Sequence, residues 1–133
     1  MKNIIHILCL LSSLLAQYDI EGRWHLVGYE DNVMYQFEDN YRYTIYSTDG
    51  NFGGLEDAGG SPNPYTLEED IITIDLFFGT IVSYQINYIC SGQAVEFIDT
   101  TYGTTHSILF REGYSFINID IMIINYIFIR IFS

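Results

Sequence analysis

Apolar and polar residues alternate along most of this chain in short runs that are separated by turn-forming residues. Between residues 22 and 111 no stretch with a helical period is long enough to form an ordinary helix. The extended runs span residues 22–29, 33–38, 41–48, 65–68, 71–78, 80–90, 93–99 and 104–111. Short strands with short links predict an all-β fold, a small antiparallel up-and-down β-barrel of about eight strands that closes on itself and leaves no exposed edge.

Two stretches of turn residues interrupt this pattern in different ways. Asp49-Gly50 directly follows the alternating run 41–48 and predicts a tight hairpin. Residues 53–64 contain four glycines and two prolines, which predict a loop with at most one short edge strand. We therefore expect the sheet to be weakest at this loop.

Alternation also assigns a face to each residue once Trp24 is placed inside the barrel. The predicted inward positions form the candidate ligand-binding interior, which comprises Leu26, Tyr35, Phe37, Tyr43, Ile45, Leu76, Phe78, Tyr84, Ile86, Phe97 and Ile108. By the same criterion Ile74, Val82, Tyr88, Val95 and Phe110 face inward, while Thr73, Asp75, Ser83, Gln85, Asn87 and Glu96 face water. Buried tyrosine hydroxyls need partners, and polar tips among aromatic walls suit an amphipathic small molecule.

The first sixteen residues have the order of features that is typical of a secretory signal peptide. Lys2 supplies the positive charge, residues 4–11 supply the apolar stretch, and Ala16 supplies the small residue for cleavage. The alternative is a buried N-terminal strand or helix. We expect cleavage after Ala16, a secreted or periplasmic location, and a barrel domain that spans residues 17–115. Cys90 is then the sole cysteine, so the exported domain has no internal disulfide.

Residues 116–133 differ from the barrel pattern because eight of these eighteen residues are isoleucine. We expect this tail to be poorly ordered or packed outside the barrel. A membrane anchor is an alternative, but the segment is short and is interrupted by Asn118, Asp120, Asn125 and Arg130. Translation beyond an ancestral stop, or after a frameshift, is a further alternative.

The charge of the chain restricts its partners. Five Lys and Arg against 17 Asp and Glu give a formal net charge of -12. Such a chain repels phosphate backbones and anionic membrane surfaces. We expect no nucleic-acid partner and no stable membrane insertion of the mature domain.

The start of the first predicted strand carries a family resemblance. Gly22-Arg23-Trp24 matches the G-x-W signature of the lipocalins, and the run that follows it resembles the first strand of compact bacterial lipocalin-like domains. Residues 43–50, which end in Asp-Gly, and a last strand that ends at Arg111 extend the resemblance over residues 20 to 112. The resemblance implies that Arg111 lies over Trp24 as a structural pair that closes the barrel.

The chain also departs from the classical lipocalins. They are longer, carry a Thr-Asp-Tyr motif before a late strand and pack a helix on the barrel. This chain has Asp99-Thr100-Thr101-Tyr102 in that region and no helix candidate. Independently of the family, glycine at position 22 allows a backbone conformation that other residues avoid, and Trp24 is large enough to fill the narrow end of a small barrel.

No catalytic or metal-binding constellation emerges from the sequence. Asp49, Asn51 and Gly54 match three positions of an EF-hand loop, but Gly60 stands where a bidentate glutamate is needed. His25 and His106 fall on neighbouring strands without a third ligand, which makes a poor zinc site. We expect no metal, no cofactor and no enzymatic activity.

Two functions remain open. The first is an exported barrel that binds a small hydrophobic or amphipathic molecule in its interior. The second is a structural or interaction module whose barrel is filled by its own side chains and whose acidic, tyrosine-rich exterior contacts another macromolecule. The sequence does not fix the oligomeric state.

Overall fold

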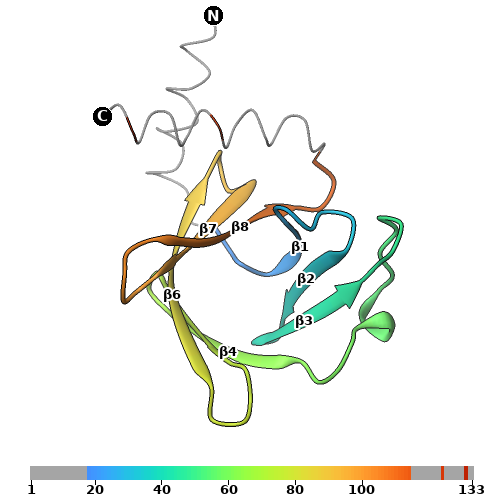
Figure 1. Ribbon diagram of the computed structural model, residues 1–133, viewed down its shortest axis with the longest axis horizontal. Coiled ribbons are helices and arrows are strands. Elements are labelled where there is room, and N and C mark those ends of the chain that lie inside the picture. The colour runs from blue at the N-terminus through green and yellow to red at the C-terminus, as the bar shows by residue number, and fades with distance from the viewer. Residues whose placement is uncertain (1–17, 115–123, 125–130, 132–133) are drawn as a thin grey trace, which may run out of the picture.

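Eight strands form one closed antiparallel barrel in which each strand pairs with the next and β1 pairs with β8 (Figure 1). The computed structural model describes residues 18–114, together with 124 and 131. Its strands are β1 (Gly22–Leu26), β2 (Val33–Glu38), β3 (Tyr41–Tyr46), β4 (Asn63–Glu68), β5 (Ile71–Asp75), β6 (Ile81–Ile89), β7 (Ala94–Asp99) and β8 (Thr105–Arg111). The predicted all-β closed barrel is confirmed. The predicted signal peptide and nearly all of the predicted tail lie outside the described residues.

The two ends of the barrel differ. Because successive strands are antiparallel, the connections 27–32, 47–62, 76–80 and 100–104 all lie at one end, which we call the loop end. Residues 18–21 precede β1 and run across the ring of strands (Figure 1), and Ile20 is buried in the core. We call the end that these residues occupy the covered end.

The barrel interior is a continuous apolar cluster. Its buried members are Ile20, Trp24, Phe37, Tyr65, Ile72, Ile74, Tyr84, Ile86, Val95, Phe97 and Leu109. Fully burying a large apolar side chain contributes about 1.5–3 kcal/mol. This cluster therefore holds the strands of the barrel together.

The inward assignment of Ile108 and Phe110 was wrong. Val95 faces the interior and pairs with Leu109, so Leu109 shares its face. The pairing of β7 with β8 shifts by one residue between Phe97 and Ile98, and this irregularity brings Leu109 rather than Ile108 opposite Val95. Ile108 and Phe110 instead belong to a second apolar cluster with Ile89 and Ala94.

The inward assignment of Tyr43 and Ile45 was also wrong. Asp39 and Asn40 form a two-residue turn with φ of 51° and 64°, as a tight hairpin requires. The turn places Phe37 opposite Arg42 and Tyr35 opposite Thr44. Directly opposed residues share a face, so Arg42 and Thr44 face the interior and Tyr43 and Ile45 face outward.

The predicted hairpin at Asp49-Gly50 does not form. β3 ends at Tyr46 and β4 begins only at Asn63, with a short 3-10 helix at Leu55–Asp57 in between. This loop folds back over the outer face of the barrel, where Ala58 forms a bridge with Ile45 and Phe52 packs against His25. Outward-facing Ile45 is thereby fully buried. As predicted, the sheet is weakest here, since β3 and β4 share only two residue pairs.

Phe78 lies outside the barrel, contrary to the alternation pattern. β5 ends at Asp75, and Phe77 and Phe78 have φ of 67° and 53° in the turn that follows. Positive φ breaks the extended geometry on which alternation depends. The Phe78 side chain is fully exposed at the loop end.

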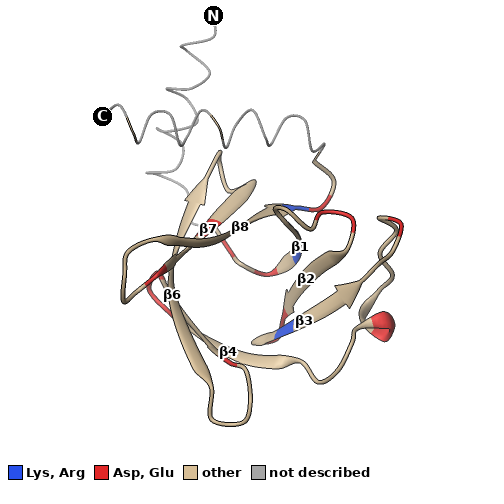
Figure 2. Ribbon diagram, in the orientation of Figure 1, with Lys and Arg blue, Asp and Glu red and all other residues tan. Residues whose placement is uncertain are grey.

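Charge is distributed unevenly over the described residues. The cations among them are Arg23, Arg42 and Arg111, while acidic residues occur on many strands and loops (Figure 2). Glu96 is an exception to its predicted exposure, because it is 2% exposed and accepts hydrogen bonds from Asn87 and Thr105. Within the described residues no helix has the length and apolar character needed to cross a membrane.

Candidate functional site inside the barrel

Arg42 is a cation on the inner face of the barrel. Its guanidinium carbon lies 4.7 Å from the centroid of the Tyr35 ring. Nη2 donates a hydrogen bond of 2.8 Å to Oδ1 of Asn63, the first residue of β4. The Nε atom is buried and has no hydrogen-bond acceptor within the described chain. One strong donor at a buried position is therefore left unused within the described residues.

Electrostatics at Arg42 are set by burial and by tyrosines. Burial lowers the pKa of Arg42, and the nearby hydroxyls of Tyr35, Tyr84 and Tyr46 act in the opposite direction. Arginine nevertheless stays charged in proteins. In contrast, Arg23 pairs with Glu112 on the outside, and Arg111 donates to three carbonyls.

An aromatic wall lies on β6, β7 and β8. The rings of Tyr84 and Phe97 stack with centroids 5.8 Å apart and an interplanar angle of 14°. The His106 ring lies 4.7 Å from that of Tyr84. Burial raises the pKa of the Tyr84 hydroxyl, and the positive charge of Arg42 opposes this shift. The wall therefore combines stacked apolar faces with a hydroxyl that stays protonated near neutral pH.

The apolar residues near the loop end are only partly covered. Leu26 ends β1, Leu76 follows β5, and Val82 lies at the start of β6. Each packs against the interior cluster but is only partly buried. At the covered end, by contrast, Ile20 and Trp24 have almost no exposed surface.

The covered end is closed by the residue pair that the resemblance implied. The Arg111 guanidinium carbon lies 4.2 Å from the centroid of a Trp24 ring. Gly22 has φ of 118°, and a Cβ at this position would lie 3.1 Å from Nη1 of Arg111. The positive φ therefore favours glycine here, and any larger side chain would also have to displace Arg111 slightly.

Tyr65 and Tyr88 are further tyrosines of the interior cluster. Burial, with smaller contributions from nearby acidic groups, raises the pKa of each to about 12. The Tyr88 ring packs against Tyr18 with centroids 5.5 Å apart, and its buried hydroxyl has no partner within the described residues. Both hydroxyls therefore stay protonated when exposed tyrosines ionise.

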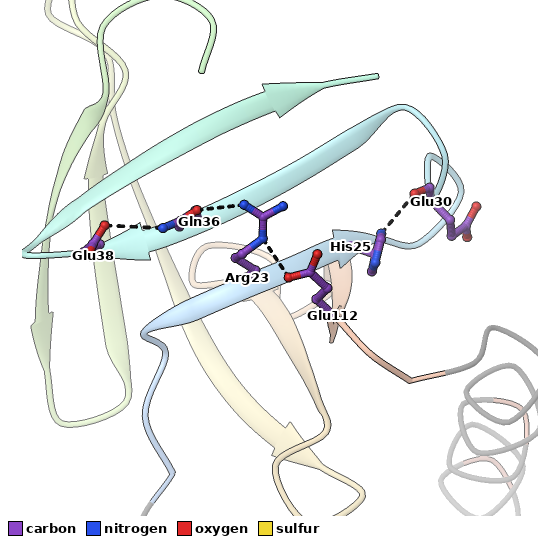
Figure 3. A network of polar contacts seen from close by, with 6 residues as sticks. All are labelled: Arg23, His25, Glu30, Gln36, Glu38 and Glu112. Atoms are coloured by element: carbon purple, nitrogen blue, oxygen red, sulfur yellow. Dashed lines mark hydrogen bonds and ion pairs between the residues drawn. The ribbon is translucent and has the colours of Figure 1, made fainter. Parts of the chain in front are cut away.

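A chain of polar contacts lies on the outer face of β1 and β2 (Figure 3). Arg23 donates to Glu112 at 2.7 Å and to Gln36 at 3.1 Å, and Gln36 donates to Glu38 at 3.3 Å. On the same strand, His25 lies 3.0 Å from the carbonyl oxygen of Glu30 and stacks on Phe110. His25 thus lies opposite Phe110 rather than opposite His106.

The predicted interior set divides into two groups. Seven members belong to the interior cluster, namely Leu26, Tyr35, Phe37, Leu76, Tyr84, Ile86 and Phe97. The other four members, Tyr43, Ile45, Phe78 and Ile108, lie outside it, for the reasons given above. The sequence analysis did not identify Arg42 or Asn63 as site residues. A two-residue turn at Asp39-Asn40 would have been the signal for Arg42, because such a turn pairs Arg42 with inward-facing Phe37.

No group of three or more His, Cys, Asp or Glu side chains in the described part of the chain is arranged to hold a metal ion. Comparison of the chain with protein-family models, with curated proteins and with solved structures finds no match. The functional argument therefore rests on the geometry of the barrel itself.

Proposed function

We propose that this chain is a non-enzymatic, lipocalin-like protein that binds a small hydrophobic or amphipathic molecule at the loop end of its barrel. The observation that carries the proposal is the difference between the two ends of the interior. Apolar side chains are fully buried at the covered end, whereas Leu26, Leu76 and Val82 keep accessible apolar surface at the loop end. Accessible apolar surface that continues into an aromatic interior favours a small apolar ligand.

The polar groups nearby favour an amphipathic ligand. Arg42, Asn63 and the Tyr84 hydroxyl lie among aromatic and aliphatic side chains. A few convergent polar groups in a mostly apolar lining are the usual composition of small-molecule sites. The closed architecture with Arg111 over Trp24 supports the lipocalin-like interpretation.

The test uses the neutral fluorescent probe Nile red and native mass spectrometry of the exported protein. We expect a Kd on the order of micromolar and a small molecule that co-purifies with the protein. Tyr84→Ala or Phe97→Ala should weaken binding, because each removes one face of the stacked wall. Tyr43→Ala is the matched control, since Tyr43 faces outward on β3. A folded wild-type protein that binds no apolar probe would refute the proposal.

We also propose that the protein is exported through its N-terminal sixteen residues and acts outside the cytoplasm. Lys2, the apolar stretch 4–11 and Ala16 support this assignment. Residues 18–20 belong to the packed domain, so cleavage after Ala16 leaves the covered end intact.

Exposed aromatic residues favour a second candidate function, contact with a protein partner that has a basic surface. Tyr29, Tyr46, Phe78 and Tyr102 are all exposed near the loop end, and the chain carries a net charge of -12. Aromatic residues are enriched at protein interfaces, and opposite charge steers association. A partner retained by wild type and lost by a Phe78→Ser, Tyr102→Ser variant, with no Nile red binding by either, would favour this function.

A further inference from the structure

Arg42 differs from Arg23, which pairs with Glu112, because Arg42 faces the barrel interior and makes no ion pair within the described residues. Within the described residues, the groups that interact electrostatically with it are the side chains of Tyr35, Tyr84 and Tyr46. Asn63 accepts one of its hydrogen bonds, and the buried Nε has no acceptor among the residues that the structure describes. A buried charge without a counter-ion, and a buried donor without an acceptor, are both unfavourable.

An anion bound beside the guanidinium would supply both a counter-ion for the charge and an acceptor for Nε. Within the described residues, the buried Nε of Arg42 is a donor without an acceptor, and the guanidinium fork matches the two oxygens of a carboxylate. The Tyr35 ring holds the guanidinium from one side and Asn63 holds Nη2, so the group is already oriented before a ligand arrives. Little ordering of the side chain is then needed on binding.

The charge of the ligand follows from the charge of the site. Arg42 supplies a single positive charge, and the remaining interior neighbours are aromatic or aliphatic. A monoanion neutralises that charge. A phosphate dianion would leave one negative charge unpaired inside an apolar barrel of a protein with a net charge of -12.

We propose that Arg42, oriented by Tyr35 and Asn63, binds the carboxylate of an amphipathic monocarboxylic acid whose apolar part lies along Tyr84, Phe97 and the partly buried residues of the loop end. This assignment rests on the proposed small-molecule function and names its ligand class. Asn63 is a positioning residue, because it acts on the ligand through the guanidinium.

The experiment compares a dansyl-labelled undecanoic acid with its methyl ester, which has nearly the same shape and no charge. Wild type should bind the acid at least about tenfold more tightly than the ester, in the range expected for a charge-assisted hydrogen bond. Arg42→Met should bind the two probes with equal affinity. Arg23→Met is the matched control, because Arg23 lies on the outer face of β1 and pairs with Glu112.

The outcomes separate this inference from the proposed function. Equal affinity of wild type for acid and ester overturns the carboxylate assignment and leaves small-molecule binding in place. Failure to bind either probe overturns the proposed function itself. Because the comparison of acid with ester is made on wild type, it decides the question even where Arg42→Met does not fold. Asn63→Leu should reduce the preference for the acid, because Asn63 accepts from Nη2 of Arg42.

Discussion

Arg111 lies over the indole of Trp24 and also holds the residues that cover this end of the barrel. Its Nε donates to the carbonyl of Gly92 at 3.1 Å, Nη1 to that of Glu21 at 3.1 Å, and Nη2 to that of Asp19 at 2.6 Å. Trp24 in turn donates from Nε1 to the carbonyl of Ile20 at 2.7 Å. The pair therefore joins β1, β8, the turn before β7 and the segment before β1 at one point.

We predict that Arg111→Ala lowers the free energy of unfolding by about 2–4 kcal/mol, because it removes three charge-assisted hydrogen bonds and a cation–π contact. Urea denaturation measures this change, and the fluorescence of Trp24, the sole tryptophan, should shift as its environment opens. Arg23→Ala serves as the control, because it removes an exposed ion pair worth about 0–1 kcal/mol. A similar loss in both variants would contradict the closing role of Arg111.

We predict that the mature protein begins at Gln17. Cleavage beyond Ile20 would remove the carbonyl that accepts from Trp24 and the ring of Tyr18 that packs on Tyr88. Intact mass measurement of exported protein checks the site of cleavage. Exported material that retains Met1, or that starts after Ile20, is the opposing result.

The identity of the inward residue on β8 gives a further prediction. Leu109 is fully buried in the interior cluster, whereas its neighbour Ile108 is partly buried against the second cluster. Leu109→Ala should destabilise the barrel by about 2–5 kcal/mol, which is the usual cost of emptying a core position. Ile108→Ala should cost clearly less in the same urea titration. The reverse order would restore the face assignment that simple alternation gave.

Alternation predicted the fold more reliably than the faces of individual strands. Strand existence depends on local composition, and the closed barrel of eight strands followed from it. Faces depend on register, and register depends on turns and bulges that lie between the runs. The shift at Phe97 and Ile98 moved Leu109 inward, and the positive φ of Phe77 and Phe78 released Phe78 from the sheet.

The candidate site was harder to predict because its central residue contradicts the usual pattern. An arginine in an alternating strand is normally assigned to the solvent face. The two-residue turn at Asp39-Asn40 nevertheless makes Glu38 face Tyr41 and Phe37 face Arg42. Contacts of Arg42 with Asn63 depend on closure across the long loop, which no local pattern encodes.

Tyrosine ionisation should weaken the barrel above pH 10. The folded-state pKa of Tyr65 and of Tyr88 is raised to about 12 from an ordinary value of 10.0. Below pH 10 both hydroxyls are protonated in the folded and the unfolded chain, so their effect on stability does not change with pH. Between pH 10 and 12 the unfolded chain loses these protons while the folded chain keeps them, and stability falls as pH rises.

Urea midpoints between pH 9 and 12 check this dependence, and absorbance at 295 nm should show that Tyr65 and Tyr88 ionise later than exposed tyrosines. Tyr65→Phe with Tyr88→Phe should flatten that part of the profile. Tyr88→Phe alone should not destabilise the protein, because the hydroxyl that it removes is buried without a partner. A pH profile that is unchanged in the double variant would show that other groups control the alkaline transition.

The last prediction concerns the seam between β3 and β4, which the proposed carboxylate site spans. Only Tyr41 with Pro64 and Arg42 with Asn63 pair across it, whereas β6 and β7 share six pairs. Few inter-strand hydrogen bonds make local opening easier. Amides of the seam residues Arg42 and Asn63 should therefore exchange with deuterium faster than those of β7 in the ligand-free protein.

A carboxylic acid bound at Arg42 should slow exchange at this seam, because the guanidinium contacts both β3 and, through Asn63, β4. Hydrogen exchange with and without dansyl-undecanoate measures the effect, and the methyl ester should protect the seam less than the acid does. In Arg42→Met the difference between acid and ester should vanish. Equal protection of the seam and of β7 in the ligand-free protein would contradict the weakness of this seam, and protection confined to β7 on binding would place the carboxylate away from Arg42.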